Sequence, residues 1–227
     1  MTRTIPYDPA YALCPLWVLA GEFVMTSPNA AELTLPGEGL FFTSDTHFGH
    51  ANIIKYCSRP FNSATHMDEM LISNWNETVG PEDTVFHLGD FCFGKPQKWL
   101  SILERLNGRI YLIVGNHDDR GLNDKVVSRF AAVSMQMRIR VYGQKIYLNH
   151  FPFLCFDGGY SNVWQLFGHV HSKAGMTGME SSRLMHLYPT QYDVGVDNND
   201  YRPVSFSRIC SVINAQIKAA NGEPQSD

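Results

Sequence analysis

The sequence predicts an α/β fold, in which strands and helices alternate along the chain. Residues 84–88 and 110–114 are short apolar runs of the kind that form buried strands, and an amphipathic stretch with helical spacing lies between them. Strand, helix and strand in this order indicate a parallel crossover unit. Five apolar runs end in Asp, Asn or His, and open α/β sheets place their sites at the carboxyl ends of strands.

The composition narrows the class of protein. A chain of 227 residues with 44% hydrophobic content can bury a sizeable core, which excludes a disordered chain. The formal net charge of −4 argues against a broad nonspecific nucleic-acid surface, although a local basic groove stays open. The five cysteines are odd in number and include no Cys-x-x-Cys pair, so we expect reduced thiols in a cytoplasmic protein.

The first 39 residues differ from the rest of the chain. They contain five prolines, and we expect an irregular N-terminal arm of unclear role, with at most one strand pair near residues 16–25. The apolar stretch at 13–25 is interrupted by Pro15, Gly21 and Glu22 and is too short to span a bilayer, so we expect no membrane association. The main domain is assigned to residues 40–220.

The first part of that domain is expected to alternate between strands and helices. Its elements in chain order are a strand at 40–44, a helix at 65–79, a strand at 84–88, a helix at 95–106 and a strand at 110–114. Thr65 is the expected N-cap of the first helix, because acidic residues follow it in the first turn. Gly108, just past the second helix, is typical of a C-cap.

The second part has a weaker periodicity. Its expected elements are a helix and then a loop at 121–137, a hairpin of strands 138–142 and 145–148, a strand at 164–167, a loop at 172–190, a strand at 192–196 and a closing helix at 207–220. The hairpin is indicated by Gly143-Gln144 between its two strands. Apolar residues on one side indicate the closing helix.

Residues able to bind metal follow five of the expected strands. They are Asp45 and His47, then Asp90, then Asn116 and His117, then His150, and finally His169 and His171. In extended backbone, residues i and i+2 point to the same side, so each Asp-x-His or His-x-His pair can bind one ion together or two neighbouring ions. Any single His is more often a core residue, but the joint pattern favours a metal site.

The chemistry of these residues limits the metal. Imidazole, carboxylate and carboxamide without thiolate favour Mn, Fe, Zn, Ni or Co over a structural zinc site built on cysteines. Asp90 stands alone at its strand end, as a carboxylate that bridges two ions would. Gly89 and Gly168 directly precede ligand residues, which is consistent with a crowded backbone at the site.

In their order, these blocks resemble the calcineurin-like metallophosphoesterase superfamily. The blocks are Asp45-Thr46-His47, Gly89-Asp90, Gly115-Asn116-His117-Asp118, His150 and Gly168-His169-Val170-His171, and the resemblance covers residues 40 to about 206. It implies a four-layer α/β/β/α sandwich of two mixed sheets with a dinuclear metal centre. By the family pattern, one ion is held by Asp45, His47, Asp90 and His171, and the other by Asp90, Asn116, His150 and His169. His117 is then the catalytic histidine.

The sequence departs from one branch of that superfamily. Serine/threonine protein phosphatases continue Gly-Asp with Asp-Arg-Gly and carry Glu after Asn-His, whereas this chain has Phe91-Cys92-Phe93-Gly94 and Asp118. Residues 42–54, together with Trp75-Asn76 and Gly195-Val196-Asp197, are similar to a small group of bacterial and phage phosphoesterases. Because the substrates of that group are poorly defined, this closer resemblance does not define the substrate.

The resemblance implies a hydrolase of phosphomonoesters or phosphodiesters, including nucleotide-type substrates, with two transition-metal ions, Mn²⁺ foremost. A metal-bound hydroxide would attack phosphorus in line, and His117 would protonate the leaving oxygen or donate to the phosphoryl group. Asp118 or Asp45 could orient the His117 ring. Two alternatives remain open, a noncatalytic binding scaffold and a metal-dependent nuclease, although the acidic balance does not favour nucleic acid. The oligomeric state is left open.

Other residues are weaker candidates. His50, Asn52 and Arg59 are candidate substrate contacts, with packing in a turn or loop as the alternative for each. His87 alternates with Phe86 and Leu88, so we expect it to pack in the core.

Overall fold

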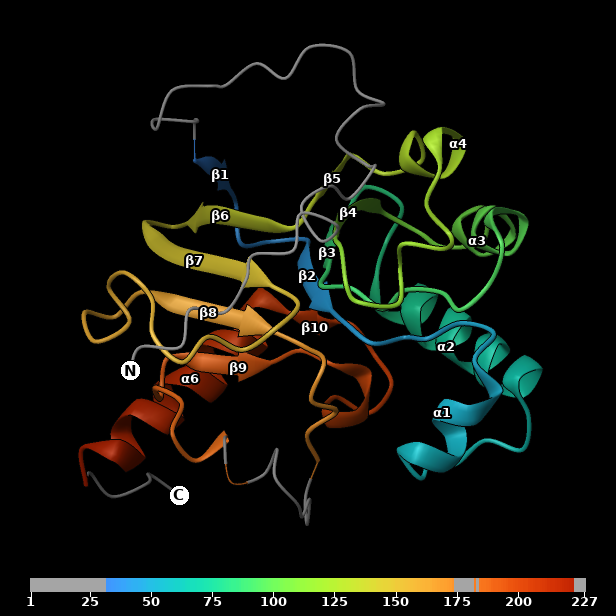
Figure 1. Ribbon diagram of the computed structural model, residues 1–227. Helices are drawn as coiled ribbons and strands as arrows, with labels where there is room; N and C mark the ends of the chain where they lie inside the picture. Colours follow the sequence, from blue (N-terminus) through green and yellow to red (C-terminus); the bar gives the residue numbers. More distant parts are fainter. Residues whose placement is uncertain (1–31, 174–181, 183, 223–227) are drawn as a thin grey trace, which may run out of the picture. The chain divides into compact units, whose positions relative to one another are not determined.

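Two five-stranded sheets form the framework of the computed structural model, which describes residues 32–173, 182 and 184–222 (Figure 1). The β3 sheet has the order β10 (Val204–Ser205), β2 (Leu40–Thr43), β3 (Thr84–His87), β4 (Arg109–Ile113) and β5 (Ala132–Ser134). The β7 sheet has the order β1 (Leu33–Leu35), β6 (Gln136–Val141), β7 (Gln144–Asn149), β8 (Trp164–Phe167) and β9 (Gln191–Asp193).

Both sheets are mixed, which confirms the expected fold class. In the β3 sheet, β2 to β5 run parallel and β10 pairs antiparallel with β2. In the β7 sheet, β7, β8 and β9 run parallel, β6 is antiparallel to β7, and β1 is parallel to β6. The carboxyl ends of β2, β3 and β4 therefore lie along one edge, and those of β7 and β8 lie along the corresponding edge of the other sheet.

Helices cover the outer face of the β3 sheet. Four of them, α1 (Ala51–Tyr56), α2 (Ala64–Thr78), α3 (Pro96–Leu103) and α4 (Asp124–Val127), gather on one side of that sheet in Figure 1. Their buried Trp75 and Trp99 pack in one cluster with Val85 and Leu112 of the sheet. The C-terminal helix α6 (Phe206–Ala220) instead contacts β9 of one sheet and β10 and β2 of the other.

A second apolar core fills the space between the sheets. Phe42, Phe86 and Tyr111 stack on one another across the β3 sheet, with ring centroids 5.6 and 4.7 Å apart. They belong to the same buried cluster as Ile146 and Leu166 of the β7 sheet. Because successive side chains of a strand point to opposite faces, Val85 packs under the helices while Phe86 packs between the sheets.

The structure adds elements that the sequence did not indicate. β1 lies inside the range assigned to the N-terminal arm, and α1, β5 and β10 are also new. Each is short, so it carries little periodicity. The three strands among them pair with strands distant in the chain. The expected strand pair at 16–25 lies outside the described residues, as do residues 174–181 and 183 of the expected loop at 172–190.

The main expected elements are present with shifted ends. Strands β2, β3, β4 and β8 and helices α2, α3 and α6 all occur, although α3 ends at Leu103 rather than at residue 106. The hairpin of β6 and β7 is confirmed, and its turn residues Tyr142 and Gly143 both adopt left-handed φ, of 47° and 84°. The 192–196 strand is shorter than expected, because a 3-10 turn, η3 (Val196–Asn198), follows β9.

Two further features bear on the expectations about membrane association and cysteine oxidation. Within the described ranges, no helix is both long enough and apolar enough to cross a membrane. Four cysteines, Cys57, Cys92, Cys155 and Cys210, lie in those ranges as free thiols.

The N-cap of α2 gives a direct test of this helix boundary. The Ser63 side chain, not that of Thr65, accepts a hydrogen bond from the backbone N–H of His66, at 3.1 Å. We expect Ser63→Ala to lower the free energy of unfolding by about 1 kcal/mol, because one N–H of the first turn loses its acceptor. Thr65→Ala, an exposed position inside the helix, should change it much less. Urea unfolding followed by circular dichroism measures both, and equal effects would contradict the assigned cap.

Candidate metal centre

The candidate ligands come from the ends of five strands in two sheets. The structure brings two groups of three together, such that within each group one ligand atom per residue lies within 4.8 Å of the other two. The first group, called here the Asp45 triad, is Asp45, His47 and His171. The second, the Asp90 triad, is Asp90, His150 and His169.

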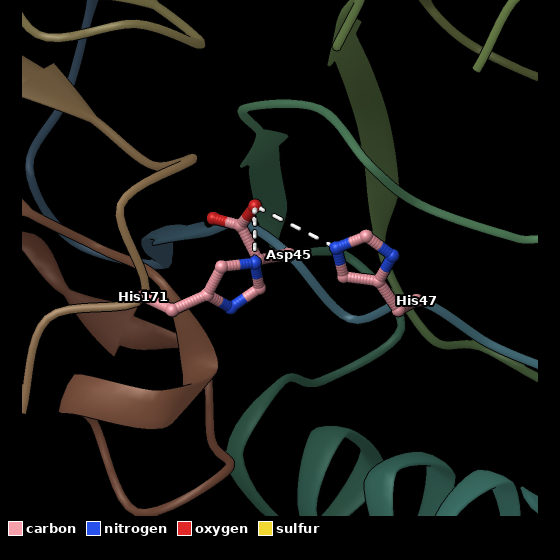
Figure 2. A group of neighbouring side chains, drawn as sticks. All are labelled: Asp45, His47 and His171. Atoms are coloured by element: carbon pink, nitrogen blue, oxygen red, sulfur yellow. Dashed lines mark ion pairs between the residues drawn. The ribbon is translucent and has the colours of Figure 1, made fainter. Parts of the chain in front are cut away.

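The Asp45 triad converges on one carboxylate oxygen. Figure 2 shows the imidazoles of His47 and His171 both directed at Asp45. Nε2 of His47 lies 4.0 Å and Nε2 of His171 lies 3.8 Å from Oδ1 of Asp45. These separations exceed a hydrogen bond, and the buried Asp45 Oδ1 and His47 Nε2 have no hydrogen-bond partner in the described part of the chain. Buried polar atoms without partners are costly, and a cation between them would satisfy both.

The Asp90 triad has a ring whose protonation the backbone determines. Nδ1 of His150 lies 2.8 Å from the carbonyl oxygen of Leu88, which can only accept, so Nδ1 carries the hydrogen. In the neutral ring, Nε2 then holds a lone pair. That atom faces Oδ1 of Asn116 at 3.0 Å and Oδ2 of Asp90 at 3.6 Å. Lone pairs turned toward one another repel, and a bound cation reverses the sign of this interaction.

Asp90 belongs to the second triad and also faces the first. Its Oδ2 lies 3.4 Å from Nε2 of His47 and 3.6 Å from Nε2 of His150. Its other oxygen, Oδ1, accepts the backbone N–H of His117 at 2.9 Å. Burial, with a smaller contribution from nearby Asp45, raises the pKa of the Asp90 carboxyl above its ordinary value. One oxygen is therefore held by the backbone, and the other faces both groups.

The imidazoles of His47 and His169 are kept neutral by their surroundings, whereas that of His171 is not. Burial lowers the pKa of His47 well below its ordinary value, and nearby His171 lowers it further. Burial, and then His150, also lowers the pKa of His169. Neutral imidazole is the form that binds a metal ion, so these two shifts suit ligand residues. His171 differs: burial disfavours its charged form, but hydrogen bonds to Asp197 and Cys57 and the nearby Asp45 raise its pKa to about 11.

Five of the candidate ligand residues are not in extended backbone, which corrects one step of the sequence argument. Asp45, His47, Asp90, His169 and His171 all have positive φ, between 48° and 71°. Asp45 and His47 meet in one triad, whereas His169 and His171 belong to one triad each. Left-handed turns after the strands direct these side chains, rather than the alternation of an extended chain. Residues other than glycine rarely adopt the left-handed backbone region, and such strain is concentrated at functional sites.

The expected crowding behind the ligands is confirmed. A Cβ atom added at Gly89 would lie 2.6 Å from the backbone nitrogen of Gly115 and 2.7 Å from Nδ1 of His150. At Gly168 it would collide with the side chains of Ser44 and Asp45. Both positions therefore require glycine, because the ligand-bearing loops pack directly on their backbone.

Asp118 does not orient His117, contrary to expectation. Its buried carboxylate instead accepts three backbone N–H groups, those of Asp90 and Gly115 on one oxygen and that of Phe91 on the other, at 2.8–2.9 Å. Asp45 also has another role, because its Oδ2 accepts the backbone N–H of His169 at 2.9 Å. Both carboxylates thus join ligand-bearing loops to one another.

Arg59 is a second correction, because it lies inside the protein instead of facing a substrate. It is 4% exposed, and its guanidinium binds both oxygens of Asp197 at 2.7 and 2.9 Å. Its remaining N–H groups point to the carbonyl oxygens of Asp45 and Thr46 and to the sulfur of Met67. These contacts leave no donor for a substrate.

Two carboxylates were missed by the sequence argument. Asp197 accepts a hydrogen bond from Nδ1 of His171 at 2.7 Å, which leaves Nε2 of that ring to face Asp45. Such a partner is common behind a metal-binding histidine. Asp193, also buried, accepts the backbone N–H groups of Ser172 and Gly195. The only sequence signal was the Gly195-Val196-Asp197 motif, which carried no indication of this role.

The remaining candidates lie at the open side of the site. The side chain of His117 is exposed, and its ring centroid is 5.5 Å from that of His47. His50 is half-buried, with Nδ1 3.3 Å from Nδ1 of His47. Asn52 is exposed in the first turn of α1. His87, by contrast, is fully buried and contacts Thr46, and burial lowers its pKa to about 3, as expected for a core residue.

Comparison with known proteins places this arrangement in a family. Residues 40–197 match the family described as calcineurin-like phosphoesterase. The chain is 36% identical to an uncharacterized protein of Methanocaldococcus jannaschii, over 77% of this chain and 90% of that one. It is 31% identical to the Gene 66 protein of Mycobacterium phage L5, over 69% and 86% of the two chains. A solved structure of a protein of unknown function from Aquifex aeolicus is similar with a TM-score of 0.57 at 26% identity, covering 76% of this chain and 98% of that one.

The Arg59–Asp197 pair predicts a large loss of stability on truncation. Both side chains are fully buried, so Arg59→Ala leaves a buried carboxylate without its cation. We expect the free energy of unfolding to fall by about 3–5 kcal/mol. Arg105→Ala removes an exposed, solvent-screened pair with Glu69 and should change the free energy of unfolding far less. Denaturant unfolding compares the two variants. An Arg59→Ala protein of unchanged stability and weakened substrate binding would restore the substrate-contact role.

Proposed function

The chain belongs to the calcineurin-like phosphoesterase family, whose members are metal-dependent hydrolases of phosphorylated substrates, and from this premise we propose that it is a dinuclear phosphoester hydrolase. The observation that carries the proposal is the position of Asp90. One oxygen of this carboxylate lies within 3.6 Å of an imidazole nitrogen from each triad. A carboxylate shared in this way is suited to bridge two ions.

The proposed ligands of the two ions divide between the triads. Asp45, His47 and His171 would hold one ion with Asp90, and Asn116, His150 and His169 would hold the other with the same Asp90. The buried atoms of Asp45 and His47 that lack partners support this assignment, as does the lone pair of His150 turned toward two oxygens. Mixed oxygen and imidazole ligands without thiolate fit Mn²⁺, Fe, Zn, Ni or Co, and of these we propose Mn²⁺.

Bound divalent ions would supply charge stabilisation to the phosphoryl oxygens and acidify a water molecule. The residues of this chain have their own parts. Leu88 and Asp197 fix the rings of His150 and His171 so that Nε2 of each faces the carboxylates. Asp118 binds the backbone at both Asp90 and Gly115 and so holds the β3 and β4 loops at a fixed separation.

His117 is the proposed general acid. Its backbone N–H is bound to Asp90, which holds the residue at the centre, while its side chain is exposed. The ring can therefore reach a leaving oxygen and give it a proton. No side chain is needed as a nucleophile, since water supplies the attacking oxygen. We also propose a cytoplasmic setting, which the four free cysteines support.

Asp90→Asn tests the bridging role. The amide still accepts from the backbone of His117 but no longer carries the charge that two cations share. We expect metal content to fall from two ions per chain to one or none, and hydrolysis of a chromogenic phosphate ester with Mn²⁺ to fall about 100-fold or more. Asp119→Asn, an exposed position in the β4 loop, makes the same charge change and should alter neither. Two ions still bound to Asp90→Asn by elemental analysis would refute the bridge.

His117→Ala separates catalysis from metal binding. Since the ring is not a proposed ligand, both ions should remain, while kcat falls by about 10²–10⁴-fold through loss of the general acid. His66→Ala, at an exposed position of α2, is the control and should keep full turnover. Elemental analysis and steady-state kinetics give the two readouts. Full activity of His117→Ala would remove this residue from the reaction. A wild-type protein that binds two ions but hydrolyses no ester would instead be a noncatalytic scaffold.

A further inference from the structure

An aromatic surface lies beside the proposed general acid. The ring of Phe93 stacks on His50, with centroids 4.2 Å apart and planes at 16°, and lies 6.1 Å from the ring of His117. Tyr56 adds an edge contact to His50 at 6.4 Å. Phe93 is 41% and Tyr56 is 74% exposed, so both present apolar area to solvent next to the reacting groups. We call Tyr56, Phe93 and His50 the Phe93 surface.

A second apolar surface lies beside the other triad. The ring of Phe151 is 4.6 Å from that of His169 and 4.9 Å from that of His150. It borders a cavity of about 360 Å³, large enough for a small organic group. The lining consists of Phe151, Pro152, Leu154, Val170, Leu184 and Leu187, together with His169. Within this lining, His169 is the only polar side chain. We call it the Phe151 cavity.

Each of the two surfaces contacts a different triad, and contacts between side chains connect one surface to the other through the metal centre. Phe93 reaches the Asp45 triad through His50 and His117, whose rings are 5.2 and 5.5 Å from that of His47. Phe151 contacts the rings of the Asp90 triad directly. Asp90 joins the two halves, within 3.6 Å of both His47 and His150. A phosphoryl group bound over Asp90 would have an apolar surface on either side.

We propose that the substrate is a small phosphodiester with a flat or apolar group on each of its two ester oxygens. This proposal rests on the proposed phosphoesterase function. A monoester carries one organic group and would leave one of the two surfaces unused, whereas a diester occupies both. Exposed apolar area that borders polar groups in this way marks a binding site. Nucleosides joined by one phosphate have the required chemistry, since every base offers a flat face for stacking.

The surrounding charge favours a small diester over a polymer. A nucleic-acid strand is held by several cations along its backbone, and this chain carries a net charge of −4. Three cations near the site are already engaged: Arg59 with Asp197, Lys98 with Asp68, and Lys173 with the carbonyl oxygen of Cys57. One phosphate bound at the centre needs none of them.

The position of His117 determines which organic group of the diester lies on which surface. Water adds to phosphorus and the bond from phosphorus to the leaving oxygen breaks, so that oxygen needs a proton, which His117 gives. The departing group therefore lies over the Phe93 surface, because Phe93 borders His117. The group that stays on the product, a phosphomonoester, lies in the Phe151 cavity.

Three chromogenic esters with the same leaving group test this assignment. They are 4-nitrophenyl phosphate, methyl 4-nitrophenyl phosphate and phenyl 4-nitrophenyl phosphate, assayed with the Mn²⁺-loaded full chain. We expect the phenyl diester to have the highest kcat/KM, about tenfold above the methyl diester, because only its retained group fills the Phe151 cavity. The monoester should be the poorest of the three.

Variants locate the preference. Leu154→Ser and Phe151→Ala should lower the ratio of phenyl to methyl kcat/KM toward one, while metal content stays at the wild-type value. Phe93→Ala should lower kcat/KM for both diesters and leave their ratio intact, because they share the leaving group. Tyr160→Ala, an 83% exposed aromatic residue outside this cavity, is the matched control and should change neither value. The ratio of phenyl to methyl kcat/KM does not change when a variant merely contains less folded enzyme, because both values fall by the same factor.

The possible failures are distinguishable. A wild-type ratio near one, or faster hydrolysis of the monoester than of either diester, overturns the diester assignment and leaves the phosphoesterase function intact. Faster cleavage of a long single-stranded DNA than of a dinucleotide overturns the choice of a small substrate. Hydrolysis of none of these esters by the metal-loaded protein overturns the proposed function itself.

Discussion

The centre depends on the junction between the two sheets at their carboxyl edges. Ser44, the residue after β2, forms a parallel bridge with Gly195, which follows β9 of the other sheet, and the carbonyl of Ser44 accepts the N–H of Val196 at 3.1 Å. A second link joins Asp45 to the backbone of His169. Without this junction, the ligands on β2 and β3 would lie on one sheet and those on β7 and β8 on another, and neither sheet alone has a complete set.

This junction also explains the strain at the site. Strands that end against one another leave little room, so the chain turns sharply and five ligand residues adopt left-handed backbone. Gly89 and Gly168 are required because other loops pack on them. The buried atoms of Asp45 and His47 then remain without partners. Folding of the ligand-free chain must overcome these costs, and the two apolar cores supply the compensating burial. Metal binding would relieve part of them, so stability and ligand binding are coupled in this fold.

The polar residues of the two triads and the apolar residues of the Phe93 surface and the Phe151 cavity have different proposed functions. The carboxylates and imidazoles of the two triads form a centre suited to cations and phosphate, a chemistry common to the family. The groups that could select a particular ester lie outside that centre, on Phe93 and Tyr56 beside one triad and around Phe151 beside the other. Phe93 and Phe151 belong to loops and Tyr56 ends helix α1, so these side chains can change without disturbing the sheets. On the proposed function, reaction type and substrate choice would therefore depend on different parts of the structure.

The sequence by itself determined the α/β class, the main strands and helices, and the candidate ligands, because these features are local. An apolar run followed by Asp or His is visible within six or seven residues, and the order of the blocks indicated the family. Only the tertiary structure decided the roles of Arg59, Asp118 and Asp197. The Arg59–Asp197 pair joins residues 138 positions apart, and Asp118 acts on a loop 28 residues away. No pattern in a short window encodes such pairings, because they depend on how distant loops meet once both sheets have formed.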